Sequence, residues 1–189
     1  MKMLSLNKQK HNEPDFDELY RMISDLKSFL DEDMIFNENL DIILDFQDDD
    51  GSFKFFDSYK IPSDAVIDFC FIPTYLCTAI LMKAYLTDSE HFTSKGKSGL
   101  LKGLEKSCDI NLCGHGFEAL SGQIYALNIF MKAGLKEFLD IHSDICPKFS
   151  DIIKRIISQY RDMESKGKFF GSWGESYESE IKQINEYFS

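Results

Sequence analysis

The stretch from Phe117 to Ala133 reads FEALSGQIYALNIFMKA and decides the fold class. Its apolar residues recur at spacings of three and four, which is the period of an α-helix with one buried face. Gly134 follows directly, and a glycine there accommodates the left-handed conformation in which many helices end. A Gly114-His115-Gly116 hinge precedes the segment. The pattern therefore predicts a helix over 117–133.

The same helical period returns along most of the chain, and no segment alternates with period two for long enough to predict a strand. Asp15 or Asp17 can cap the first helix. Pro73 and Pro147 suit a first helical turn, because the hydrogen that proline lacks would be unpaired there. The chain is therefore predicted to be all-α, built from antiparallel α/α hairpins. Further helices are expected at about 15–30, 40–46, 73–86, 88–104, 135–141 and 147–160, and around Ile181, Ile184 and Phe188.

The chain divides into an arm and one domain. Residues 1–14 are polar and lack any period, which predicts a flexible N-terminal arm. Residues 15–189 then form a single helical-hairpin domain, since 189 residues suit one domain. No apolar segment of a secretory signal opens the sequence, so a cytoplasmic protein is expected. Reduced thiols are expected at all five cysteines, which are Cys70, Cys77, Cys108, Cys113 and Cys146.

The net charge of the chain limits the classes of partner that it can bind. Lysine and arginine number 21 against 32 aspartate and glutamate residues, and the net charge is −11. Phosphate backbones and anionic lipids repel such a chain, so no nucleic-acid partner is expected. The most apolar run, 65–86, is interrupted by Asp68, Pro73 and Lys83, which leaves it too short to span a membrane. The 17 phenylalanines can fill a core or line an apolar pocket.

Two loops share a pattern in which glycine and serine precede an aromatic residue. One reads QDDDGSF over 47–53, and the other reads FGSWG over 170–174. Each follows an apolar helix and precedes another, so helical hairpins recur about every 45 residues. The three adjacent carboxylates, Asp48, Asp49 and Asp50, are interpreted as a solvated turn and not as the acid of a cyclase.

This pattern resembles the α/α-toroid repeats of terpenoid cyclases and protein prenyltransferase β subunits. In that superfamily a Gln-x-x-Asp-Gly-Ser-Phe/Trp loop joins an outer helix to an inner one. The chain has room for about four hairpins, fewer than the closed ring of the family, so the resemblance implies a partial or open α/α toroid. It also implies that an apolar, isoprenoid-like ligand or a protein partner binds on the concave face. The matching residues are Gln47, Asp50, Gly51, Ser52 and Phe53.

The resemblance further implies a zinc site. In prenyltransferase β subunits an Asp, a Cys two residues later and a His on a later helix hold zinc, and Asp68, Cys70 and His115 match that arrangement. Such a set leaves one tetrahedral position open for a substrate thiol. Cys108 and Cys113 with the same histidine form a competing set. In the simpler interpretation the carboxylate caps a helix, the thiols pack as small apolar groups, and no cofactor is bound.

Polar residues form one stripe along the helix predicted at 117–133. His115, Glu118 and Tyr125 are the candidate catalytic residues, because a buried His–Glu pair has shifted pKa values suited to general acid–base work. The alternative is an ordinary amphipathic helix whose polar side meets water. The full stripe consists of His115, Glu118, Ser121, Tyr125, Asn128 and Lys132.

Three functions are compatible with these features. The first is a toroid-like module that binds an apolar ligand or a protein partner on its concave face without catalysis. The second is a zinc-dependent, prenyltransferase-like or terpenoid-cyclase-like enzyme. The third is a structural or assembly unit whose exposed hairpin edge pairs with another copy in a homodimer. The sequence favours the first.

Overall fold

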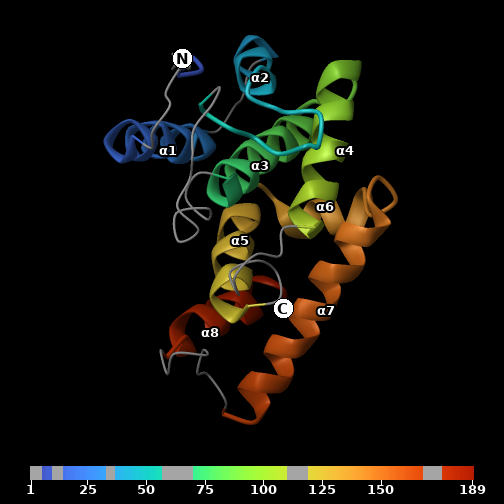
Figure 1. Ribbon diagram of the computed structural model, residues 1–189. Coiled ribbons are helices and arrows are strands. Elements are labelled where there is room, and N and C mark those ends of the chain that lie inside the picture. Colours follow the sequence, from blue (N-terminus) through green and yellow to red (C-terminus); the bar gives the residue numbers. More distant parts are fainter. Residues whose placement is uncertain (1–5, 10–14, 33–36, 57–69, 110–118, 168–175) are drawn as a thin grey trace.

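The computed structural model describes residues 6–9, 15–32, 37–56, 70–109, 119–167 and 176–189 (Figure 1). Within these ranges the chain forms eight α-helices, and its only β-type pairings are isolated bridges. The prediction of an all-α fold is therefore confirmed. The helices are α1 (Phe16–Leu30), α2 (Asn37–Leu44), α3 (Ile72–Thr87), α4 (Ser94–Asp109), α5 (Leu120–Lys132), α6 (Leu135–Ile141), α7 (Pro147–Ser165) and α8 (Glu178–Tyr187).

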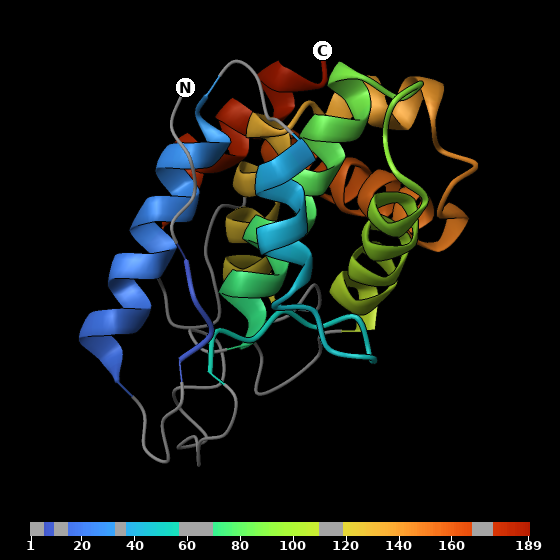
Figure 2. The same ribbon diagram turned by 90° about the horizontal axis from the view of Figure 1, so that it is seen from above.

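Helix α3 lies between α1 and α4 (Figures 1 and 2). Its sequence, IPTYLCTAILMKAYLT, contains Lys83 as its one charged residue and apolar side chains on every side. A helix without a polar face is stable in water only when neighbours surround it. Helix α3 packs against α1, α2, α4, α5 and α6, and the side chains of Cys77 and Ile80 are fully buried. The core of the molecule is therefore built around α3.

Helix α3 is also the most apolar of the described helices, and it has 16 residues. A helix needs about 20 predominantly apolar residues to cross a bilayer. None of the helices in the described part of the chain is both long and apolar enough to do so.

Several helices begin and end where the sequence predicts. The carboxylate of Asp15 accepts a hydrogen bond from the backbone N–H of Glu18 at 3.0 Å, which caps α1. Pro73 and Pro147 lie in the first turns of α3 and α7. Gly134 follows α5 with φ 89°, a left-handed conformation that favours glycine. Local capping chemistry therefore sets these boundaries.

Helix α4 begins at Ser94, six residues later than the expected start at Asp88. The hydroxyl of Thr93 accepts a hydrogen bond from the N–H of Gly96 at 3.0 Å and takes the capping role. Asp88 instead follows the last turn of α3, and its N–H donates to the carbonyl of Ala84. Two residues can cap a helix here, and packing against α3 selects the second.

Helix α5 begins at Leu120, while the sequence predicts its start at Phe117. Ala119 has an extended backbone, with φ −95° and ψ 138°, so it stands before the first turn. Residues 117 and 118 lie outside the described residues. The helix predicted at 40–46 corresponds to α2, which is displaced by a few residues toward the N-terminus.

Helix α4 approaches its neighbours closely because two glycines face them. A Cβ atom placed on Gly103 would overlap the hydroxyl oxygen of Thr78 on α3. A Cβ atom on Gly99 would overlap a methyl group of Leu44 on α2. These glycines lack a side chain where the helices are nearest, so a residue with a side chain would force the helices apart.

Residues 6–9, within the arm predicted for 1–14, lie against the segment after α2. The N–H of Gln9 donates to the carbonyl of Phe55 at 2.8 Å, and Gln9 forms a parallel bridge with Phe56. Leu6 is only 6% exposed and belongs to the core. This short piece of the arm therefore covers apolar side chains of the domain.

Candidate functional site

The segment 47–53, here called the Gln47 loop, closes on its own backbone. The N–H of Asp48 donates to the carbonyl of Ser52 at 2.8 Å, and the N–H of Gly51 donates to the carbonyl of Asp48 at 3.0 Å. Gly51 has φ 87°, which favours glycine. The carboxylate of Asp50 accepts hydrogen bonds from both the N–H and the hydroxyl of Ser52. The turn predicted from the acidic residues and glycine is therefore present.

The side chain of Gln47, the first residue of this loop, contacts α4. The amide of Gln47 donates to the carbonyl of Gly99 on α4 at 2.9 Å and to the carbonyl of Gly51 at 3.3 Å. Gly51 itself lies against α4, since a Cβ atom there would be 2.9 Å from the carbonyl carbon of Lys102. The Gln47 loop therefore fastens the end of α2 to α4.

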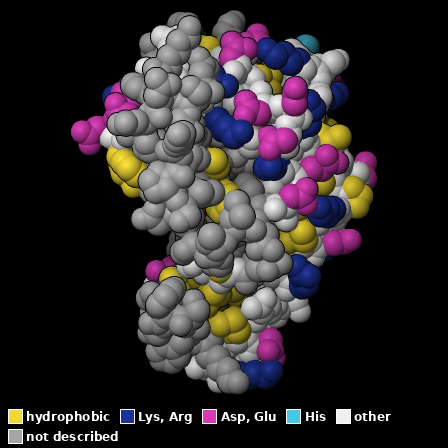
Figure 3. Space-filling model, viewed as in Figure 1, with side chains coloured by type: hydrophobic (Ala, Val, Ile, Leu, Met, Phe, Trp, Pro, Cys, Tyr) yellow, Lys and Arg dark blue, Asp and Glu magenta, His cyan; other side chains and the backbone are white. Residues whose placement is uncertain are grey.

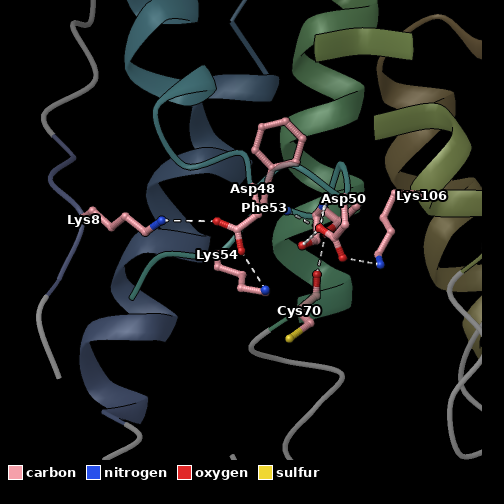
Figure 4. Close-up of polar contacts among 9 residues, drawn as sticks. Lys8, Asp48, Asp50, Phe53, Lys54, Cys70 and Lys106 are labelled. Carbon is pink, nitrogen blue, oxygen red and sulfur yellow. Dashed lines mark hydrogen bonds and ion pairs between the residues drawn. The ribbon is translucent and has the colours of Figure 1, made fainter. Parts of the chain in front are cut away.

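Lysines pair with two of the three adjacent carboxylates (Figure 4). Asp48 contacts Lys54 at 2.7 Å and Lys8 at 3.5 Å, and Asp50 contacts Lys106 at 2.6 Å. Acidic and basic side chains stand next to one another across the upper part of this face (Figure 3). Two of the three acidic residues of this turn are therefore ion-paired with lysines.

The pKa of Asp50 is shifted by opposing effects. Partial burial disfavours the charged carboxylate, but hydrogen bonds from Lys106 and Ser52 outweigh it and hold the pKa of Asp50 below its usual range. A carboxyl whose pKa is lower in the folded state stabilises the fold above the unfolded-state pKa. That contribution is lost as the pH falls through the folded-state pKa.

Replacing Asp50 with asparagine is expected to lower the free energy of unfolding by about 0.5–1 kcal/mol at neutral pH, because an exposed ion pair is lost. The difference from wild type should shrink as the pH falls below the ordinary aspartate value of about 3.9. Urea unfolding of both proteins across this range measures it. Asp49→Asn is the control, since Asp49 is exposed and pairs with no described lysine. A difference in the free energy of unfolding that does not change with pH would contradict a stabilising role of the ionised Asp50 carboxylate.

Cys70 stands two residues before α3, and its backbone carbonyl belongs to the network around the Gln47 loop. The hydroxyl of Thr74 donates to the carbonyl of Cys70 at 2.7 Å and accepts from the N–H of Phe53 at 3.0 Å (Figure 4). Asp68 and His115, the other predicted zinc ligands, lie outside the described residues. No cluster of three or more potential metal ligands occurs within the described ranges. The zinc site stays a prediction.

The thiols that the structure describes are free cysteines, and burial raises their pKa values where a shift is resolved. Burial raises the pKa of Cys108 to about 12 and raises the pKa of the fully buried Cys77 thiol further. The pKa of Cys146 is raised by the same cause. These three side chains are therefore neutral and pack as small apolar groups. Cys113, the third cysteine of the competing ligand set with His115, lies outside the described residues.

Part of the predicted polar stripe on α5 meets a cleft, here called the Tyr125 cleft. The polar residues Tyr125, Asn128 and Lys132 line it, together with the apolar side chain of Ile129 from the same helix. His115 and Glu118, the other candidate catalytic residues, lie outside the described residues. The structure therefore neither joins them to Tyr125 nor separates them from it. What it does place together is the C-terminal half of the stripe.

The Tyr125 cleft has a volume of about 240 Å³ and lies between three helices. Helix α1 contributes Lys27 and Leu30, and α3 contributes Leu76. The ammonium of Lys27 stands 5.6 Å from the centre of the Tyr125 ring, a distance typical of a cation–π contact. The leucines are almost fully buried, so they form an apolar floor beneath the polar rim. Apolar walls with a few polar groups are typical of ligand sites.

Two further lysines secure the end of α1 beside this cleft. Lys83 of α3 donates to the carbonyls of Leu30 at 2.8 Å and Glu32 at 2.5 Å. Lys132 of α5 pairs with Asp31 at 2.8 Å. The carbonyl end of a helix carries a partial negative charge, and these cations neutralise it together with the acidic residues there. The wall that α1 forms is thereby held against α3 and α5.

Tyr125 carries an unusual hydroxyl. Its oxygen is buried, and it has no hydrogen-bond partner among the described residues, although the ring is only half-buried. Such a group loses its bonds to water without compensation, which costs about 1–3 kcal/mol. Buried polar groups in folded proteins nearly always have a partner. The described residues therefore leave this hydroxyl uncompensated, as they do the buried hydroxyl of Thr78.

Replacing Tyr125 with phenylalanine is therefore expected to raise the free energy of unfolding by about 1 kcal/mol, because the uncompensated hydroxyl is removed. Tyr160→Phe is the matched control, since the hydroxyl of Tyr160 donates to the side-chain oxygen of Gln123 at 3.1 Å. That control should lose about 1 kcal/mol. Urea unfolding measures both variants. A loss of stability in both would show that the Tyr125 hydroxyl has a structural partner.

The sequence did not identify the walls from α1 and α3. One signal was present, because Lys27 stands four residues after Ile23 and three before Leu30, inside the apolar stripe of α1. A lysine in an apolar stripe is unexpected unless it reaches an edge or a cleft. Leu76 carried no such signal, since it is one of many apolar residues along α3.

A second hollow, of about 300 Å³, shares Lys132 with the Tyr125 cleft. Its other lining residues are Lys83, Leu86, Thr87, Ala133, Gly134 and Glu137. Lys83 is engaged with the carbonyls at the end of α1. The apolar side chains of this lining are Leu86 and Ala133, against Leu30, Leu76 and Ile129 in the Tyr125 cleft. The Tyr125 cleft is therefore the better candidate for a binding site.

No protein-family model, curated protein or solved structure in the comparisons matches this chain. The assignment of the site therefore depends on the geometry of the chain itself, and the toroid resemblance contributes a hypothesis only.

Proposed function

We propose that this chain is a helical module that binds an apolar small molecule in the Tyr125 cleft without catalysing a reaction on it. One observation carries the proposal. The polar stripe of α5, with Tyr125, Asn128 and Lys132, meets the apolar side chains of Leu30 and Leu76 from two other helices around one cleft. A ligand with an apolar body and one polar end would match both kinds of wall.

The arrangement of hairpins as a partial or open α/α toroid belongs to the same proposal. The Gln47 loop supports it, because Gln47 and Gly51 link the end of one helix to α4 as a repeat loop would. Helix α3 is surrounded by other helices, so the ligand would bind beside it and not in a central lumen. An isoprenoid-like compound, which the resemblance implies, is a suitable first probe.

Geraniol, a short isoprenoid alcohol, tests this function. Its binding is measured by displacement of the apolar fluorophore Nile red from the wild-type protein. Asn128→Phe places a larger apolar side chain in the cleft and is expected to weaken geraniol binding by about tenfold or more. Lys154→Phe is the control, because Lys154 is exposed on α7 and does not line the cleft.

The pattern across the variants decides the result. Binding that is lost in Asn128→Phe and kept in Lys154→Phe supports the proposal. Absence of Nile red and geraniol binding in the folded wild type, or equal binding in both variants, would overturn it. Circular dichroism of each variant shows that a loss of binding does not come from unfolding.

A further inference from the structure

We propose that the ligand of the Tyr125 cleft is a monocarboxylic acid with a short apolar tail. Its carboxylate would bind at Lys27 and Asn128, and its tail would lie on Leu30, Leu76 and Ile129. This inference depends on the proposed function and adds the charge and size of the ligand to it.

Lys27 is a cation of the cleft lining that has no acidic partner in the described part of the chain. It makes no ion pair with any described residue, and its ammonium stands over the Tyr125 ring at 5.6 Å. The ring holds the ammonium at the rim, above the apolar floor of Leu30 and Leu76. A cation held over an apolar floor favours an anion that carries an apolar group.

The lining cations of the Tyr125 cleft limit the charge of the ligand. Lys132, the other cation of the lining, is paired with Asp31, and the neighbouring Lys83 is bound to backbone carbonyls of α1. Among the described residues, Lys27 is therefore the one cation of the lining without an ion pair or a backbone acceptor. A phosphate monoester carries nearly two negative charges, and the protein itself has a net charge of −11. A single carboxylate fits this electrostatic environment, whereas a phosphate or diphosphate would be left unbalanced.

The hydrogen-bond donors and the volume of the Tyr125 cleft limit the ligand further. The amide of Asn128 can donate to a carboxylate oxygen, and the hydroxyl of Tyr125, which has no partner among the described residues, is a further donor nearby. The volume of about 240 Å³ lies below the range of about 300–1,000 Å³ typical of larger ligands. The tail of the acid is therefore short.

Octanoate and octanol test the inference, because they share a tail and differ in the charged group. Isothermal titration of the whole chain is expected to give a dissociation constant for octanoate about tenfold lower than for octanol. Lys27→Met keeps most of the side-chain length and removes the charge. It is expected to weaken octanoate binding by about tenfold, so that the variant binds octanoate and octanol about equally. Lys97→Met on α4, an exposed lysine away from the cleft, should change neither.

The other outcomes separate this inference from the proposed function. If octanol binds as tightly as octanoate, or if Lys27→Met binds both as the wild type does, the charge recognition is wrong and the apolar module stands. If octyl phosphate binds more tightly than octanoate, the single-charge argument is overturned. If neither octanoate nor octanol binds to the folded protein, the proposed function fails as well.

Discussion

Replacing Gly51 with alanine is expected to lower the free energy of unfolding by about 3 kcal/mol. Gly51 has φ 87°, and a residue with a Cβ atom pays roughly 1–2 kcal/mol in that conformation. The new methyl group would also overlap the carbonyl oxygen of Lys102, which belongs to the backbone of α4 and cannot rotate away. Overpacking of this kind costs about 1–3 kcal/mol more. Displacement of the loop would weaken the bond from Gln47 to Gly99 as well.

Gly167→Ala separates the two causes. Gly167 has φ 62° after the end of α7, and a Cβ atom there meets nothing within 4 Å. This control therefore pays only for the conformation, about 1 kcal/mol. Urea denaturation with a common m-value gives both differences. Equal losses in the two variants would show that the contact between Gly51 and α4 contributes nothing.

Replacing Gly103 with alanine is expected to cost about 2 kcal/mol, even though alanine favours a helix by about 1 kcal/mol over glycine. The added methyl group overlaps the hydroxyl and a methyl group of Thr78, which is fully buried on α3. Both helices belong to the core, so neither can move away without loss of packing. Thermal or urea unfolding of the variant measures the loss.

A second substitution makes this prediction specific to the contact. Thr78→Ala removes the two nearest of the three atoms that meet the new methyl group, so the double variant should recover most of the stability lost through Gly103→Ala. The coupling between the two substitutions is expected to be about 2 kcal/mol in the stabilising direction. Additive effects would contradict a direct contact between α3 and α4 at this point.

Capping chemistry explains which helix boundaries were predicted well. Asp15, Pro73 and Gly134 act through their own backbone or that of near neighbours in sequence, so their effect can be read locally. The start of α4 was predicted at Asp88 and lies at Ser94, because two capping residues were available and only tertiary packing chooses between them.

The candidate site was predicted in part. The stripe with Tyr125, Asn128 and Lys132 follows from helical spacing on one segment, since residues three and four apart share a face. Lys27 and Leu76 belong to helices far away in sequence, and no spacing within α5 can identify them. The pairing of Asp48 and Asp50 with lysines likewise depends on which elements meet.

The sequence by itself determined that this chain is helical, where several helices start and stop, and that QDDDGSF forms a turn. These features arise from interactions among residues a few positions apart, and such interactions do not depend on the rest of the fold. Only the tertiary structure decided that the turn is fastened to α4, that Gly103 faces Thr78, and that three helices enclose the Tyr125 cleft. Such contacts join residues far apart in the chain, and the shapes of the packed side chains select them together.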